Sequence, residues 1–253
     1  MIKIITIFYL FITILLSIGL PISIGIILKK KLNFSLKSVF VGALIFLVFQ
    51  IFTRIPILSF IQKTSWYSLY SLSYPTLTIF IISLSAGIFE EIGRFIGFKI
   101  FLKKDLNWEN GIGYGIGHGG IESILIVGVN YLIYFIISIL NNSGKLNFST
   151  QQIVLEPLIK TPSYQFLFTG IERVFAFSIQ IALSLIVLYG IKSKNFFYLL
   201  IAIIFHTIID FVAVYIYTIY KNIFFTETLV AIFSILSLVY IIKSKKYFKN
   251  ELL

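Results

Sequence analysis

Cysteine is absent from this 253-residue sequence, which has only two histidines and one methionine, and only 12% of its residues are charged. Without cysteine there can be no disulfide, thiolate metal ligand or thiol nucleophile. Charged residues make up about 25% of an ordinary soluble domain, so about half of the usual charge is missing. Any chemistry must therefore rest on a small set of polar side chains.

Apolar residues dominate the composition: 58% of the chain is hydrophobic, and its mean hydropathy is +1.00. A membrane-crossing helix needs about 20 mostly apolar residues. The sequence predicts seven, near residues 3–28, 39–62, 76–103, 111–140, 162–191, 197–220 and 224–243. The first is not followed by a small-residue cleavage site, so we expect it to be retained. The expected fold is an all-α, polytopic helical bundle in the cell membrane, forming one domain over residues 1–253.

Lysine is distributed unevenly between the two ends of this bundle. The segments after the first, third and fifth spans, together with the C-terminal tail, hold 13 of the 18 lysines. Positive residues favour the cytoplasmic side, so we predict the N-terminus outside and the C-terminus in the cytoplasm. This topology, with attraction to anionic lipid headgroups, accounts for the net charge of +11. No basic groove motif accompanies the charge, and nucleic acid is not an expected partner.

Half of the ten acidic residues fall deep inside predicted spans: Glu90, Glu91, Glu122, Glu172 and Asp210. An ionisable residue at the bilayer centre costs about 2.5–3.5 kcal/mol by insertion scales, so it persists mostly where it has a task. Each histidine also precedes an acid by four residues, His118 before Glu122 and His206 before Asp210. Because four residues make about one helical turn, each pair faces one way.

Glu90, His118 and His206 share a depth in the bilayer. At about 1.5 Å per residue they lie roughly 20, 13 and 16 Å from the cytoplasmic ends of their spans, within a hydrocarbon layer of about 30 Å. We therefore expect their side-chain heads to lie within roughly 10 Å of one another around a water-accessible pocket.

Glycine is concentrated around the first histidine, with six glycines between residues 111 and 120. Glycines let helix backbones approach closely in lipid. They also leave room beside His118 for a metal or a substrate backbone. The sequence leaves both explanations open.

Three short motifs follow one another on three of these spans. They are EEIGR at residues 90–94, an aromatic-x-x-x-His at Tyr114 and His118, and HTIID at residues 206–210. In this order they resemble the signatures of the CAAX-protease and bacteriocin-processing superfamily and the related PrsW-type proteases. The run HGGIE and the pair Glu172-Arg173 most resemble the YhfC branch, described as intramembrane metalloproteases. The resemblance covers a protease-like core over about residues 76–220.

Two positions depart from the patterns. Arg94 lies four residues after Glu90, where the prenyl-protease pattern has five. Gln180 stands where the YhfC branch is expected to carry a further histidine. A third imidazole ligand is therefore not supplied at that position.

The resemblance implies a catalytic set of Glu90, Glu91, Arg94, His118, His206 and Asp210. Glu90 would be the general base that activates water, shared with His118, while Glu91 and Arg94 would hold the site by opposite charge. His206 would stabilise the oxyanion, with Asp210 orienting its ring. If a metal is bound, Zn²⁺ would be held by His118, His206 and Glu122, since two imidazoles and a carboxylate form a known catalytic set. No HExxH motif is present, and the sequence leaves the metal open.

The predicted function is hydrolysis of peptide bonds in or beside the bilayer, with a membrane protein or peptide as substrate. One alternative is a proton- or cation-coupled transporter in which buried acids, histidines and arginines form a relay. Another is a non-catalytic membrane protein that binds a peptide or partner helix, as in bacteriocin immunity. Outside the motifs, we expect Glu172 and Arg173 to form a structural ion pair, and Arg54 to snorkel to the outer interface.

Overall fold

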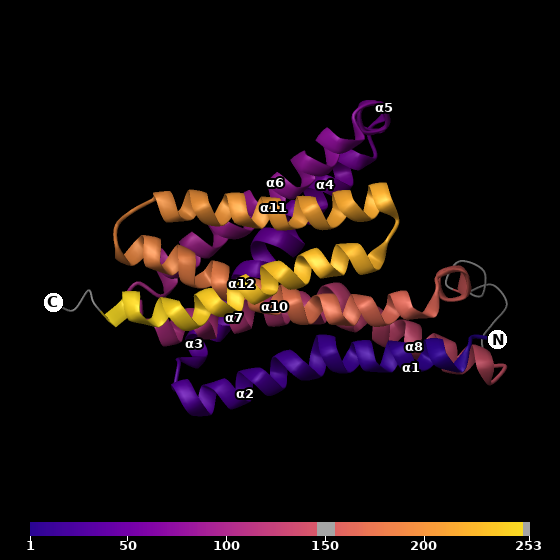
Figure 1. Cartoon of the computed structure of the whole chain (residues 1–253), viewed down its shortest axis with the longest axis horizontal. Coiled ribbons are helices and arrows are strands. Elements are labelled where there is room, and N and C mark those ends of the chain that lie inside the picture. The colour runs from indigo at the N-terminus through magenta and orange to yellow at the C-terminus, as the bar shows by residue number, and fades with distance from the viewer. Residues whose placement is uncertain (146–154, 250–253) are drawn as a thin grey trace.

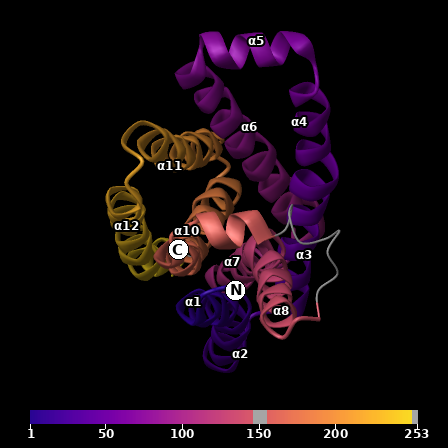
Figure 2. The ribbon, with the colours of Figure 1, turned by 90° about the vertical axis from the view of Figure 1, so that its right-hand side faces the viewer.

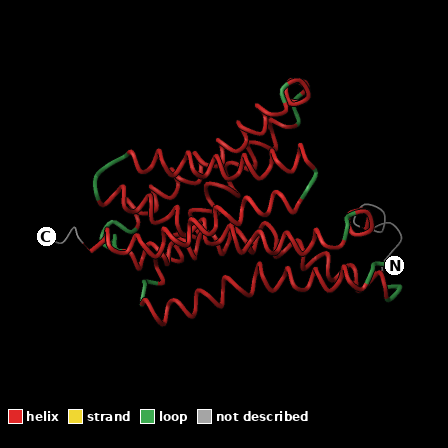
Figure 3. The backbone as a smooth tube through the Cα atoms, in the orientation of Figure 1, coloured by secondary structure: helices red, strands yellow, loops and turns green. Residues whose placement is uncertain are grey.

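The computed structural model describes residues 1–145 and 155–249, and within these residues every regular element is a helix (Figure 3). The helices are α1 (Ile4–Ile14), α2 (Leu20–Leu32), α3 (Leu36–Phe46), α4 (Ile55–Gln62), α5 (Ser65–Ser73), α6 (Pro75–Ile96), α7 (Trp108–Glu122), α8 (Val129–Asn142), α10 (Ser163–Lys192), α11 (Phe197–Tyr220) and α12 (Ile223–Lys249). Short π-helical segments join α1 to α2, α3 to α4 and α7 to α8, and another extends α6 to Phe101.

Six continuous stretches are long and apolar enough to cross a membrane: Ile4–Leu32, Leu36–Gln62, Trp108–Asn142, Ser163–Lys192, Phe197–Tyr220 and Ile223–Phe248. Helices α5 and α6 make a seventh candidate, a pair bent by 115°. The predicted all-α, multi-pass membrane bundle is thus confirmed. The start of α1 and the end of α12 lie at opposite ends of the bundle (Figure 1), as seven crossings would place them. The predicted orientation of the two termini stays a prediction.

Helix α5 was not predicted from the sequence and forms the tip of an arm built by α4, α5 and α6 (Figure 2). The bend falls at Tyr74, and Pro75 occupies the first turn of α6. Proline suits that position because its fixed φ matches a helix and its missing N–H would have no partner there. Trp66, Leu69 and Leu72 of α5 are exposed. An exposed aromatic and apolar surface of this kind is typical of a membrane interface.

Helix α7 is held between α3 and α10 by its glycines. A Cβ on Gly117 would lie 1.9 Å from the carbonyl oxygen of Val39 on α3, and one on Gly115 would lie 2.6 Å from Cα of Ile181 on α10. These distances are far inside van der Waals contact, so the backbones touch where only glycine fits. Gly120 is the exception in the run. A Cβ added there would fit, because its nearest neighbour would lie at an ordinary contact distance of 3.5 Å. Close helix packing therefore explains most of the glycine run.

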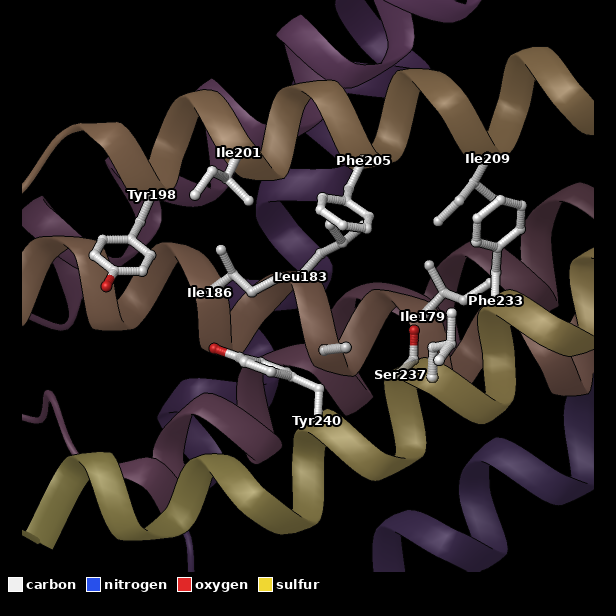
Figure 4. A pocket seen from close by; sticks show the side chains of 12 residues that line it. Ile179, Leu183, Ile186, Tyr198, Ile201, Phe205, Ile209, Phe233, Ser237 and Tyr240 are labelled. Atoms are coloured by element: carbon white, nitrogen blue, oxygen red, sulfur yellow. The ribbon is translucent and has the colours of Figure 1, made fainter.

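Helix α10 is the central element, with 67% of its most apolar window buried, against 22% for each of the other continuous spans. Its packing against α11 and α12 leaves space between the three helices. Figure 4 shows a cavity of about 380 Å³ enclosed by these three helices and lined by residues such as Leu183, Phe205, Phe233 and Tyr240. The backbone contacts of α7 with α3 and α10 form the dense side of the bundle, although a further apolar cavity of about 430 Å³ lies between α2, α3 and α7. The cavity between α10, α11 and α12 forms the open side.

Candidate metal centre and active site

Glu90, His118 and Glu122 come together at the centre of the bundle. Glu90 lies on α6, whereas His118 and Glu122 lie one turn apart on α7. One donor atom from each residue lies within 4.8 Å of the other two, and Oε2 of Glu90 lies 3.0 Å from Nε2 of His118. An imidazole with two carboxylates is a donor set that divalent cations such as Zn²⁺ accept.

The His118 ring is fixed by two aromatic neighbours. Tyr114, one turn earlier on α7, lies parallel to it with ring centroids 6.2 Å apart, and Phe46 of α3 meets it edge-on at 5.2 Å. All of its side chain is buried. Tyr114, the aromatic residue of the motif, therefore restricts the orientation of the imidazole.

Gln180 of α10 connects the two carboxylates of this group. Its Nε2 donates to Oε2 of Glu122 at 2.7 Å and to Oε2 of Glu90 at 3.2 Å. Its Oε1 accepts from Arg94 at 2.5 Å. Sequence reasoning noted Gln180 only as a departure from the family pattern. Its position as a lone amide within an apolar run was the signal that could have placed it in the site.

Arg94 lies beside the group and is fully buried. Its Nε is 3.0 Å from Oε2 of Glu91, and its guanidinium donates to Oγ of Ser184 at 2.5 Å and to the carbonyl oxygen of Gln180 at 2.7 Å. A buried guanidinium is tolerated only when its donors are satisfied and a carboxylate balances its charge. The counter-charge expected between Glu91 and Arg94 is present in this geometry.

His206 of α11 joins the site through a partner that was not predicted. Its Nδ1 lies 2.7 Å from Oε1 of Glu91, whereas Oδ2 of Asp210 is 3.7 Å from Nε2 and beyond hydrogen-bond distance. The orienting task assigned to Asp210 therefore falls to Glu91 in this structure. Nε2 of His206 is 3.8 Å from Oε2 of Glu90. Glu90 thus lies close to both histidines, as their shared depth led us to expect.

The donor group differs from the metal set expected from the sequence. The expected ligands were His118, His206 and Glu122, but among the described residues Glu90 rather than His206 gathers with His118 and Glu122. A role for His206 as a ligand stays a prediction. Nδ1 of His206 bonds Glu91, and its Nε2 lies 3.8 Å from Oε2 of Glu90.

Glu172 and Arg173 of α10 form the expected ion pair, and Arg173 extends it to the candidate metal centre. Its NH1 donates to Oε1 of Glu122 at 3.1 Å. Each oxygen of Glu122 therefore accepts one hydrogen bond, from Arg173 on one side and from Gln180 on the other. Arg173 thus helps to position a candidate ligand, a task not recognised in the sequence.

A polar cavity of about 250 Å³ opens in front of these residues. Glu90, Glu122, Gln180, His206 and Asp210 all line it. A space of this size with several polar walls has room for water and part of a peptide. The side chains that carry the candidate chemistry therefore face a common space.

Arg54 does not snorkel to the interface as expected. It is only 8% exposed and donates to Oγ of Ser85, to the carbonyl oxygen of Ile82 and to Oε1 of Gln50, at 2.9, 2.8 and 3.1 Å. Gln50 lines the polar cavity. Arg54 therefore supports the wall of the site from the end of the π-helical segment between α3 and α4, because its donors find partners inside the bundle.

A helical bundle with several membrane spans and an imidazole-carboxylate group beside a polar cavity defines a multi-pass membrane protein with a candidate metal centre. The model of the family described as YhfC intramembrane metalloprotease matches residues 12–230, and the chain belongs to this family. It is 34% identical over 239 residues to the uncharacterized membrane protein YhfC of Bacillus subtilis (strain 168), covering 91% of this chain and 93% of that relative. No solved structure matches. The likeness to the YhfC branch is confirmed, and kinship with the CAAX and PrsW proteases stays a prediction.

Proposed function

We propose that the protein is an intramembrane endopeptidase that hydrolyses a peptide bond of a membrane protein or peptide in or beside the bilayer. The observation that carries this proposal is the position of Glu90, which contacts Nε2 of His118 at 3.0 Å and also lines the polar cavity. A general base must reach both an orienting partner and the water that it activates. The family's description as a metalloprotease supports the hydrolase class.

Glu90 would accept the proton of the attacking water. Its Oε2 is occupied by His118 and Gln180, so Oε1 is the oxygen that we assign to this proton. The water oxygen would add to the carbonyl carbon of the scissile bond. Glu90 would then return the proton to the departing nitrogen as the C–N bond breaks, so one water is consumed and a carboxyl and an amine are released.

His206 would stabilise the charge that develops on the carbonyl oxygen. Glu91 binds Nδ1 and leaves Nε2 on the side of Glu90 and the cavity. With a proton on each nitrogen, His206 can bond Glu91 and also donate to the oxyanion. A donor held in place before the reaction stabilises the transition state more than one that must reorient.

Glu90, His118 and Glu122 would hold a divalent cation, and Zn²⁺ is the ion that we expect from the mixture of nitrogen and oxygen donors. The residues fit such an ion, because their donor atoms lie within 4.8 Å of one another and two of the three are carboxylates. When bound, the cation would polarise the peptide carbonyl and make the water more acidic. Nε2 of Gln180 bonds the same two carboxylates, so Gln180 and the cation compete for their oxygens.

The test uses purified protein in detergent, a pool of membrane peptides and a measurement of bound metal. Glu90→Gln keeps the size and hydrogen bonding of the side chain but removes the base. We expect cleavage to fall by about a hundredfold or more, with folding retained. The matched control is Glu109→Gln, which makes the same substitution outside the candidate site. Glu109 lies at the start of α7 and is partly exposed, with its Oε1 3.8 Å from Nζ of Lys245.

Two outcomes would contradict the proposal. One is that the zinc-supplied protein cleaves no peptide but accumulates a solute in vesicles in a pH-dependent way, which would favour the transporter. The other is that it binds a peptide tightly and never cleaves it, which would favour the non-catalytic alternative.

A further inference from the structure

A second polar cavity, of about 500 Å³, lies at the end of the bundle where α10 and α12 begin. Two carboxylates line it, those of Glu172 and Glu227. Three tyrosines, Tyr131, Tyr134 and Tyr217, contribute to the same walls. None of the chemical steps assigned to Glu90, His118 or His206 uses this cavity.

Glu227 is the unusual member of this cavity. It lies near the start of α12, where the sequence suggests the exposed end of a span. Its side chain is nevertheless only 6% exposed. Among the residues that the structure describes, no hydrogen-bond donor reaches its buried Oε2 atom. A buried carboxylate oxygen without a donor is costly, so a group that supplies a donor and a positive charge would bind there favourably.

The local charge balance also favours a cation. The carboxylates of Glu122 and Glu172 share the single guanidinium of Arg173. Glu227 adds a third carboxyl group, and no donor among the described residues reaches its Oε2 atom. The tyrosine rings offer negative faces to a cation. The cavity therefore combines a carboxyl oxygen that lacks a donor with aromatic walls.

The second cavity adjoins the polar cavity of the candidate active site. Glu172, Ala213 and Val230 line both of them. Glu227 precedes Val230 by three residues, and Ala213 follows Asp210 by three, each a step of about 4.5 Å along its helix. Glu227 and Asp210 thus each lie about one helical turn from the residues that line both cavities. A few residues of extended peptide, at about 3.3 Å per residue, could occupy both cavities at once.

We propose that the cavity between Glu172 and Glu227 binds a primary ammonium group of the polypeptide substrate, located a few residues from the bond to be cleaved. This inference rests on the proposed function, because it places one part of the substrate relative to Glu90. The ammonium can belong to a lysine side chain or to the amino terminus of the chain. In either case Glu227 supplies the carboxylate that pairs with it.

The experiment measures binding, so that it does not depend on cleavage. Fluorescent peptides that differ only in one residue, lysine or its uncharged analogue norleucine, are titrated onto the Glu90→Gln protein. Each peptide is made with a free and with an acetylated amino terminus. We expect the lysine peptide to bind about tenfold more tightly than the acetylated norleucine peptide, in keeping with a partly buried charge pair. If tighter binding depends instead on a free amino terminus, the amino terminus is the source of the ammonium.

Two variants are compared in the same background. Adding Glu227→Gln should remove the preference for the ammonium-bearing peptide. Adding Glu156→Gln should preserve it, since Glu156 is an exposed carboxylate already paired with Lys160. Should the Glu227 variant not fold, competition serves in its place: butylammonium should displace the lysine peptide from the Glu90→Gln protein, and butanol at the same concentration should not.

The inference is overturned if peptides with and without an ammonium bind equally, or if the preference survives Glu227→Gln. Failure of the proposed function looks different. In that case the unmodified protein cleaves none of these peptides, while the ammonium preference and its loss in the Glu227 variant are still measured.

Discussion

The two sides of α10 are built in contrasting ways. On one side α7 touches both α3 and α10 at positions where a single Cβ would not fit, with Gly117 against the backbone of Val39 as the tightest case. On the other side α11 and α12 border three cavities, of about 250, 380 and 500 Å³. The candidate ligands His118 and Glu122 come from the dense side, whereas the substrate space lies on the open side.

The contrast shows how a membrane protein can combine precise positioning with access. Backbone contacts at glycines cannot shift by a few tenths of an ångström without a clash, so the imidazole of His118 is held by its whole helix. The apolar side chains around the cavities have space to change rotamer when a substrate enters. Stability and recognition are therefore expected to respond to different substitutions.

The largest effect is expected for Arg94, which is buried on the dense side. Arg94→Met removes the guanidinium and leaves the buried Glu91 with His206 as its remaining partner. We expect the free energy of unfolding in detergent to fall by about 3–5 kcal/mol. The double variant Glu91→Gln with Arg94→Met should recover part of this loss, because the buried carboxylate charge is also removed. Equal stability of Arg94→Met and the unmodified protein would contradict the ion-pair interpretation.

A smaller loss is expected at the glycine contacts. Gly117→Ala places a methyl group against the carbonyl of Val39, and α7 must move away from α3. We expect a loss of about 1–3 kcal/mol in the free energy of unfolding, as for other overpacked cores, together with weaker metal binding at His118.

The control for the glycine contact is Gly19→Ala. No atom lies within 4 Å of a Cβ built at Gly19, and alanine is the better helix former. This variant should therefore be as stable as the unmodified protein or slightly more stable. If both alanine variants behave alike, the tight contact of α7 with α3 is not important for stability.

The smallest effect is expected on the open side. Ala182→Leu extends a side chain into the apolar cavity of about 380 Å³, and we expect the free energy of unfolding to change by less than about 1 kcal/mol. Its control is Ala202→Leu, because Ala202 is fully buried in the hydrophobic core. This substitution should lower the free energy of unfolding by about 1–3 kcal/mol. Similar losses in the two variants would show that the open side is packed as firmly as the core.

Much of the architecture could be predicted because hydropathy is a local property. The expected spans at residues 162–191 and 197–220 nearly coincide with Ser163–Lys192 and Phe197–Tyr220. Helix α5 was missed because its mixture of serine, tyrosine and leucine has no continuous apolar run. The six glycines predicted close packing, but their partners on α3 and α10 lie far away in the sequence.

The sequence by itself indicated most of the ionisable residues that lie inside the bundle, and the depth expected for Glu90, His118 and His206 correctly predicted that they lie close together. Arg54 and Glu227 were not recognised as buried. Only the tertiary structure decided the pairing of the site residues: Glu91 rather than Asp210 bonds His206, and Gln180 bridges Glu90 and Glu122. Depth follows from counting residues along one helix. Pairing depends on how each helix is rotated about its axis, and that rotation is set by contacts such as those of Gly115 and Gly117, between segments that are distant in the sequence.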